Sequence, residues 1–77
     1  MANVIVYSTQ SCPWCHRAMD YLKEKNIEFT HYDVSEDQEK AQEMITKSGQ
    51  RGVPVLEIDG TIVVGFDKVQ IDQLLGI

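Results

Sequence analysis

The sequence contains a short, continuous run of β-branched residues near its start, Val4-Ile5-Val6. Such a run is typical of a strand covered on both faces, because a strand with one face in water alternates apolar and polar residues. A strand of this kind needs helices on both sides of its sheet. The run therefore favours an α/β fold built around a central sheet.

A helix is predicted directly after this strand and a short loop. Pro13 suits the first helical position, since its fixed φ fits a helix and its missing N–H has no intrahelical partner there. Cys12 is then the N-cap. Ala18 and Leu22 lie four residues apart on one face, and the helix is expected to fade near Asn26.

The middle of the chain predicts a second strand and a second helix. Residues 28–34 mix polar and apolar side chains, which is typical of an edge strand. Ser35 followed three positions later by Gln38 has the pattern of a capping box, and Gly49 is a natural helix stop. Between them, helical spacing is kept by Ala41, Met44, Ile45 and Ser48.

The last third predicts a hairpin and a closing helix. The turn dipeptide Asp59-Gly60 lies between apolar runs at 55–58 and 61–64, which indicates a two-residue hairpin. Asp67 is predicted to cap the last helix. The order βαβαββα joins a parallel half to an antiparallel hairpin, so we expect a mixed four-stranded sheet flanked by three helices, which is the thioredoxin fold.

Length and composition limit the classes of function. A chain of 77 residues has room for one domain, and we expect residues 1–77 to form it as a monomer. Twelve acidic against seven basic residues give a net charge of -5, which disfavours binding to nucleic acid or anionic membranes. The first residues show no signal peptide or apolar span, so we expect a cytoplasmic protein whose thiols are kept reduced.

The stretch SCPWCH, residues 11–16, holds both cysteines of the chain and fits three chemistries. It matches a c-type haem attachment sequence, with Met19 or Met44 as a second axial ligand, but the strands and the lack of an export signal argue against haem. A closed zinc site needs four ligands, and beyond the cysteine pair only His16 and His31 remain. We therefore favour a redox dithiol and predict no metal site.

The position of the pair at a helix start assigns a role to each sulfur. Unpaired N–H groups and the helix dipole stabilise a thiolate at Cys12, and a stabilised thiolate is a good leaving group. Cys15, one turn further on, lies within disulfide range. We predict that Cys12 attacks and Cys15 resolves. Trp14 between them either presents its ring to an incoming disulfide or covers the helix end.

Three stretches, VYSTQSCPWC, RGVPVLEIDG and VVGFDK, resemble the glutaredoxins and their short bacterial relatives over nearly the whole chain. The resemblance implies a thioredoxin fold and a thiol-disulfide oxidoreductase that acts in electron transport and cell redox homeostasis. It also implies that glutathione is a co-substrate, with no tightly bound cofactor.

The same resemblance implies a substrate site. Pro54 is expected to be a cis-proline beside the dithiol, and the backbone of Val53 is expected to pair with glutathione or a peptide. Four further positions are implied to hold glutathione: Arg51 at its glycyl carboxylate, and Gly65, Phe66 and Asp67 at its γ-glutamyl end.

Two positions differ from the usual family pattern. Thr9 stands where many glutaredoxins have lysine, and Val64 precedes Gly65 where they have a second glycine. Some short relatives are instead reduced by thioredoxin reductase and deliver electrons to ribonucleotide reductase. The sequence thus leaves two electron donors open, with protein disulfides and glutathione mixed disulfides as substrates.

An alternative from another class is an iron-sulfur cluster carrier. In some glutaredoxins the first cysteine, here Cys12, holds a cluster together with glutathione and a second chain. Relatives that bind clusters usually lack a proline after this cysteine, so Pro13 disfavours the alternative by analogy.

Overall fold

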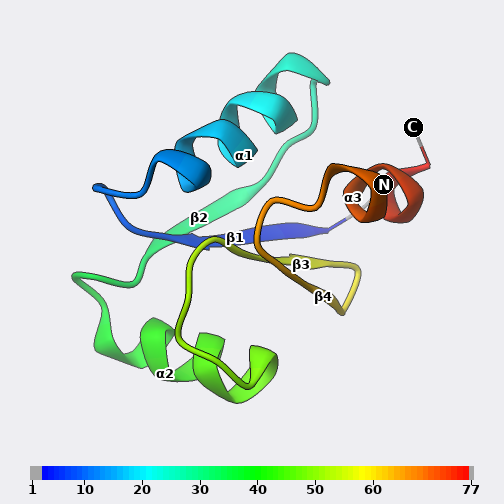
Figure 1. Cartoon of the computed structure of the whole chain (residues 1–77). Coiled ribbons are helices and arrows are strands. Elements are labelled where there is room, and N and C mark those ends of the chain that lie inside the picture. The colour runs from blue at the N-terminus through cyan, green and yellow to red at the C-terminus, as the bar shows by residue number, and fades with distance from the viewer. Residues whose placement is uncertain (1–2, 77) are drawn as a thin grey trace.

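The computed structural model describes residues 3–76, so the first two residues and the last residue of the predicted domain lie outside its description. The elements are β1 (Val4–Ser8), α1 (Pro13–Glu24), β2 (Thr30–Asp33), α2 (Gln38–Ser48), β3 (Val55–Ile58), β4 (Thr61–Val64) and α3 (Lys68–Leu75). The sheet order is β2-β1-β3-β4, with β1 parallel to β2 and the other two pairings antiparallel. The predicted thioredoxin fold is therefore confirmed (Figure 1).

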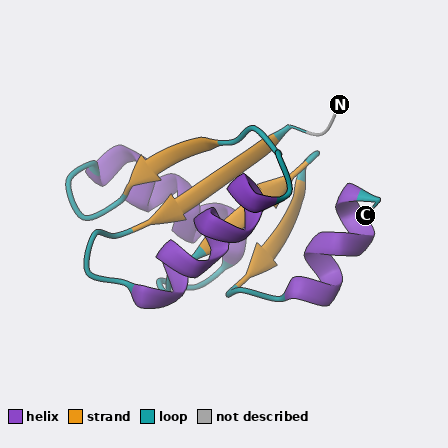
Figure 2. Ribbon diagram, turned by 90° about the horizontal axis from the view of Figure 1, so that it is seen from above, coloured by secondary structure: helices purple, strands orange, loops and turns teal. Residues whose placement is uncertain are grey.

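One face of the sheet packs against α1 and α3. Val4 and Val6 of β1 are buried together with Ala18 and Leu22 of α1 and with Ile71 of α3. Figure 2 shows α1 lying over one face of the sheet, with α3 beside it. The apolar spacing along α1 therefore points its buried stripe at the sheet, as the pattern predicted.

The opposite face of the sheet packs against α2. Tyr7 of β1 is buried with Met44 of α2 and Val55 of β3, and Ile5 packs against the same cluster. Successive residues of β1 thus alternate between the two faces, because side chains alternate along a strand. The prediction that the first strand is covered on both faces is confirmed.

The start of α2 differs from the prediction. Asp37, not Ser35, is the N-cap, and its carboxylate accepts a hydrogen bond of 3.1 Å from the backbone N–H of Lys40. The N–H and hydroxyl of Ser35 both donate to the carboxylate of Asp33, so Ser35 belongs to the turn after β2. Asp37 is the better cap because it lies directly before the helix and adds a negative charge at the positive end of the dipole.

Two other elements, β2 and α1, are shorter than predicted. The strand expected at 28–34 covers only Thr30–Asp33, although it is an edge strand as expected. α1 ends at Glu24, and the backbone of Asn26 is already left-handed with φ 59°.

None of the helices in the described part of the chain has the length and apolar character that a membrane crossing requires.

The hairpin and the closing helix follow the prediction. Asp59 and Gly60 have φ values of 49° and 87°, and positive φ at both positions is the requirement of the favoured hairpin turn. The carboxylate of Asp67 caps α3 by accepting from the N–H of Gln70 at 3.2 Å.

The cap of α2 can be tested by two alanine substitutions. Asp37→Ala removes the acceptor of a helical N–H and should lower the free energy of unfolding by about 1 kcal/mol. Ser35→Ala leaves the helix start intact and should cost less than about 0.5 kcal/mol. Urea denaturation followed by far-UV circular dichroism measures both, and a larger loss for Ser35→Ala would contradict the assignment.

Candidate active site

Cys12 lies at the carboxyl end of the central strand, where it caps α1. Its backbone is extended, with φ -98° and ψ 107°, and its Sγ accepts a hydrogen bond of 3.2 Å from the backbone N–H of Cys15. The side chain is partly exposed. The predicted N-cap is confirmed, and the sulfur satisfies one of the backbone N–H groups that have no intrahelical partner at the start of α1.

Cys15 lies in the first turn of α1 and is fully buried. Burial, together with a hydrogen bond to Cys12, raises the pKa of the Cys15 thiol to about 12. Both cysteines are free thiols. The two sulfurs therefore differ in chemistry, since one is open to solvent at a helix end and the other is a shielded thiol.

The segment before β3 lies against the Cys12 sulfur. The Val53–Pro54 peptide bond is cis, and the Cys12 thiol is 3.8 Å from the carbonyl oxygen of Val53. The carbonyl oxygen of Pro54 accepts a hydrogen bond of 2.8 Å from the N–H of Gly65. The structure thus brings together Cys12, Cys15, Val53, Pro54 and Gly65, which come from three separate parts of the sequence.

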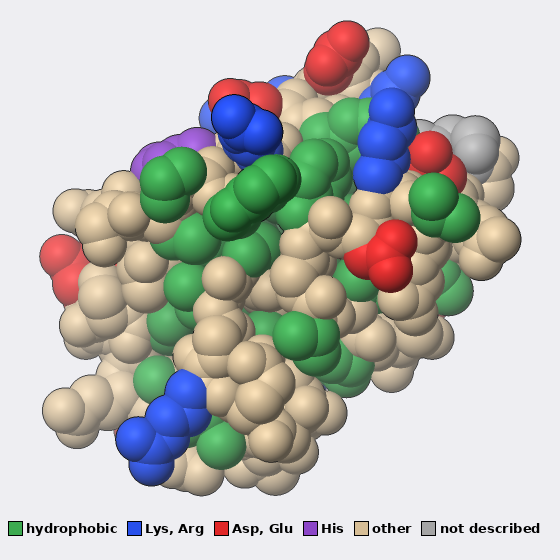
Figure 3. Space-filling model, in the orientation of Figure 1, with side chains coloured by type: hydrophobic (Ala, Val, Ile, Leu, Met, Phe, Trp, Pro, Cys, Tyr) green, Lys and Arg blue, Asp and Glu red, His purple; other side chains and the backbone are tan. Residues whose placement is uncertain are grey.

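The other predicted site residues are close in sequence to this group: Trp14, Arg51, Phe66 and Asp67. The side chain of Trp14 is 55% exposed, and the guanidinium of Arg17 lies 4.9 Å from the centre of its ring. Arg51 is exposed in the loop between α2 and β3. Figure 3 shows hydrophobic side chains gathered between the amino-terminal end of α1 and the loop after β4.

Phe66 and Asp67 make structural contacts beside the site. The ring of Phe66 is partly buried, with its centre 5.7 Å from that of Tyr21 on α1, and Asp67 caps α3. The aromatic contact joins the loop after β4 to α1. No local pattern in the sequence predicts the role of Tyr21, because its contact with Phe66 joins two elements that are far apart along the chain.

Both histidines have hydrogen-bond partners that the sequence did not predict. Nε2 of His16 is 2.8 Å from the carbonyl oxygen of Gln10, and Nε2 of His31 is hydrogen-bonded to the buried hydroxyl of Ser8. Within residues 3–76, no three His, Cys, Asp or Glu side chains converge on a point that could hold a metal ion. Strand pairing brings His31 to Ser8, and local sequence does not encode that pairing.

Comparison with known proteins identifies the family. Residues 4–63 match the family model described as glutaredoxin. The chain belongs to the glutaredoxin family. It is similar to a glutaredoxin-like protein of 8.6 kDa in the rubredoxin operon of Clostridium pasteurianum, at 50% identity over 91% of this chain and 93% of that protein. It is also similar to glutaredoxin 3 of Escherichia coli, at 39% identity over 90% of this chain and 83% of that protein.

A solved structure agrees with this assignment. The crystal structure of a glutaredoxin from Archaeoglobus fulgidus superposes with a TM-score of 0.86 at 25% identity, covering 97% of this chain and 87% of that one. As a glutaredoxin, the protein is a redox protein of the thioredoxin fold, and its Cys12–Cys15 pair fits the C-x-x-C motif.

The difference between the two sulfurs predicts selective alkylation. At about pH 7 iodoacetamide should modify Cys12 alone, because Cys15 is buried and its raised pKa keeps it protonated. Mass spectrometry of the folded protein should show one adduct, and the same reaction in urea should show two. Modification of Cys15 in the folded protein at a rate similar to that of Cys12 would contradict the difference.

Proposed function

We propose that this glutaredoxin reduces protein disulfides and glutathione mixed disulfides through Cys12 and Cys15. The observation that carries the proposal is the pairing of a partly exposed sulfur at the N-cap of α1 with a buried thiol one turn away. An exposed sulfur can be reached by a substrate disulfide, and a buried one can react only with its neighbour.

The first step is attack by the Cys12 thiolate on one sulfur of the substrate disulfide. A new S–S bond forms between Cys12 and that sulfur, the substrate S–S bond breaks, and the departing sulfur leaves as a thiolate that takes up a proton. The helix N–H that the Cys12 sulfur accepts supports this step by stabilising the thiolate before attack.

The second step releases the substrate in one of two ways. In the dithiol route, the Cys15 sulfur attacks the Cys12 sulfur and the proton of Cys15 passes to the departing substrate sulfur, so the internal disulfide forms as the bond between Cys12 and the substrate breaks. In the monothiol route, a free glutathione thiolate attacks the mixed disulfide instead. Cys12 is the leaving group when glutathione attacks the glutathione sulfur, and the same N–H stabilises it as it departs.

Substrate binding is assigned to the residues around the dithiol. We propose that the backbone of Val53, beside Pro54, pairs with the extended substrate next to Cys12, a mode in which main-chain hydrogen bonds provide affinity. The hydrogen bond from Gly65 to Pro54 supports this by fixing the loop after β4 against the same segment. Trp14, Phe66 and Asp67 border the bound substrate.

Glutathione is the electron donor that we propose, and it acts as a co-substrate. Two electrons must be returned to the internal disulfide after each dithiol cycle, and two glutathione molecules supply them by forming one glutathione disulfide. Thioredoxin reductase is the alternative donor, and ribonucleotide reductase is a candidate target in that case. We place the protein in the cytoplasm as a monomer, where reducing conditions maintain both thiols.

Single cysteine variants test the two routes. Cys12→Ser should abolish reduction of every disulfide, because no thiolate remains at the exposed position. Cys15→Ser should retain activity with a small glutathione mixed disulfide but lose activity with a protein disulfide, since glutathione replaces Cys15 only in the monothiol route. Initial rates with both substrates decide this, and activity in Cys12→Ser would end the proposal.

The donor is tested with Arg51, an exposed cation two residues before Val53. If Arg51 binds the glycyl carboxylate, Arg51→Ala should raise KM for glutathione about twofold to fivefold. Lys23→Ala provides the control, since Lys23 is an exposed cation at the far end of α1. An equal effect of the two substitutions would contradict this role of Arg51.

Two measurements separate the remaining alternatives: turnover with each electron donor, and visible absorbance after reconstitution. Turnover with thioredoxin reductase but not with glutathione and its reductase would contradict glutathione as the donor. Visible absorbance after anaerobic reconstitution with iron and sulfide would support the cluster carrier instead, which Pro13 at the start of α1 disfavours.

A further inference from the structure

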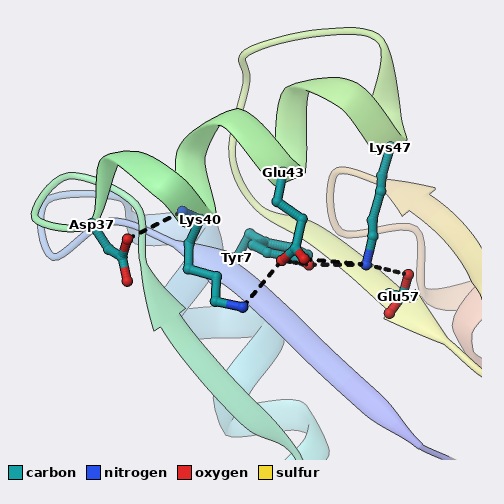
Figure 4. Close-up of polar contacts among 6 residues, drawn as sticks. All are labelled: Tyr7, Asp37, Lys40, Glu43, Lys47 and Glu57. Carbon is teal, nitrogen blue, oxygen red and sulfur yellow. Dashed lines mark hydrogen bonds and ion pairs between the residues drawn. The ribbon is translucent and has the colours of Figure 1, made fainter.

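A group of polar side chains lies between α2 and the sheet, on the side away from α1 (Figure 4). We call it the α2 cluster and define it by Tyr7 of β1, Glu57 of β3, and Lys40, Glu43 and Lys47 of α2. Glutaredoxin chemistry as described above uses none of these residues. Their contacts nevertheless hold α2 against β3, and the segment that joins these two elements contains Val53, which lies beside Cys12.

Tyr7 lies at the centre of the α2 cluster. Its side chain is fully buried, and its hydroxyl donates to Oε2 of Glu43 at 2.8 Å and accepts from Nζ of Lys47 at 3.4 Å. In the sheet, Tyr7 lies directly opposite Val55, the first residue of β3. The buried phenol therefore connects α2 to the strand pair that ends beside the active site.

Lys47 connects the last turn of α2 to β3. Its Nζ lies 2.9 Å from Oε1 of Glu57 and 3.9 Å from Oε1 of Glu43. The Glu57 side chain is only 15% exposed, so this pair is less screened by solvent than an ordinary surface ion pair. The hydrogen bond from Lys47 to Glu57 raises the pKa of Lys47, so the ammonium remains charged at neutral pH.

Lys40 makes similar contacts at the other end of α2. Its Nζ lies 3.4 Å from Oε2 of Glu43 and 4.3 Å from the centre of the Tyr32 ring on β2. Lys40 and Lys47 thus share a helix, a carboxylate partner and a similar exposure, but Lys40 belongs to the first turn of the helix. This makes Lys40 a matched control for Lys47.

The chain between Lys47 and the active site is held by its own hydrogen bonds. The hydroxyl oxygen of Ser48 lies 2.7 Å from the carbonyl oxygen of Met44 and 2.9 Å from that of Gln50, so its single proton is shared between the last turn of α2 and the segment after it. The Gln50 side chain in turn bonds both the carbonyl oxygen of Gly52, at 3.0 Å, and the N–H of Gly52. Val53 follows directly, with its carbonyl oxygen 3.8 Å from the Cys12 thiol.

We propose that Lys47 and Glu57 are positioning residues for the disulfide substrate. Their ion pair fixes the carboxyl end of α2 on β3. The hydrogen-bonded segment 48–52 follows directly, so the position of the helix end determines where the Val53 backbone lies beside Cys12. Neither residue touches substrate. The inference rests on the proposed function, because it assigns importance to Val53 as the binding backbone. A displaced Val53 backbone would weaken the main-chain hydrogen bonds to the substrate equally in the ground state and in the transition state, which raises KM and leaves kcat nearly unchanged.

The test compares Lys47→Met with Lys40→Met, which both remove a charge and keep most of the side-chain stem. Lys47→Met should raise KM for a peptide disulfide by about threefold to tenfold with little change in kcat. Lys40→Met should change KM by less than about twofold. The rate of alkylation of Cys12 by iodoacetamide should be unchanged in both, because this small reagent does not use the Val53 backbone.

Two further variants strengthen the test. Glu57→Gln removes the same ion pair from the strand side and should reproduce the change in KM, and it decides the matter if Lys47→Met fails to fold. Lys47→Arg keeps the positive charge and should restore most of the wild-type KM. Urea denaturation of each variant checks that the assays use folded protein.

The outcomes separate this inference from the proposed function. An unchanged KM in Lys47→Met and Glu57→Gln, an equal rise in Lys40→Met, or a parallel loss of Cys12 alkylation would overturn the positioning role while the wild type still reduces disulfides. A wild-type protein that does not reduce disulfides would instead overturn the proposed function.

Discussion

β1 is buried on both faces, and the arrangement of the other elements follows from this. Val6 needs α1 and α3 on one side, and Tyr7 needs α2 on the other, because neighbouring side chains of a strand point in opposite directions. Because β2 runs parallel to β1, the chain needs a crossover between the two strands, and α1 provides it after the carboxyl end of β1. Cys12 lies at this point, and in open α/β sheets such an end is the usual ligand site.

The difference between the two cysteines results from the same geometry. At the N-cap, the sulfur of Cys12 remains partly open to solvent and accepts a backbone N–H. One turn later Cys15 faces the core, where burial raises its thiol pKa. A spacing of three residues is therefore enough to give two chemically distinct thiols, and the helix that separates them also keeps them within reach of each other.

The local signals of the sequence predicted most of the fold. Pro13 fixed the start of α1, Asp59-Gly60 marked the hairpin, and Asp67 marked the start of α3, because each is a residue whose backbone preference acts within a few positions. The prediction failed at the start of α2, where Ser35 and Asp37 both fit a cap. The turn after β2 decides between them, since Asp33 takes both donors of Ser35.

The sequence by itself determined the order of elements, the position of the dithiol at a helix start and, through its motifs, the glutaredoxin family. These depend on short-range preferences and on spacing within one helix turn. Only the tertiary structure decided that the Cys12 sulfur lies beside Val53, that Gly65 bonds to Pro54, and that Lys47 reaches Glu57. Such contacts join residues from different elements, and their geometry is set by strand pairing and core packing, which no local pattern records.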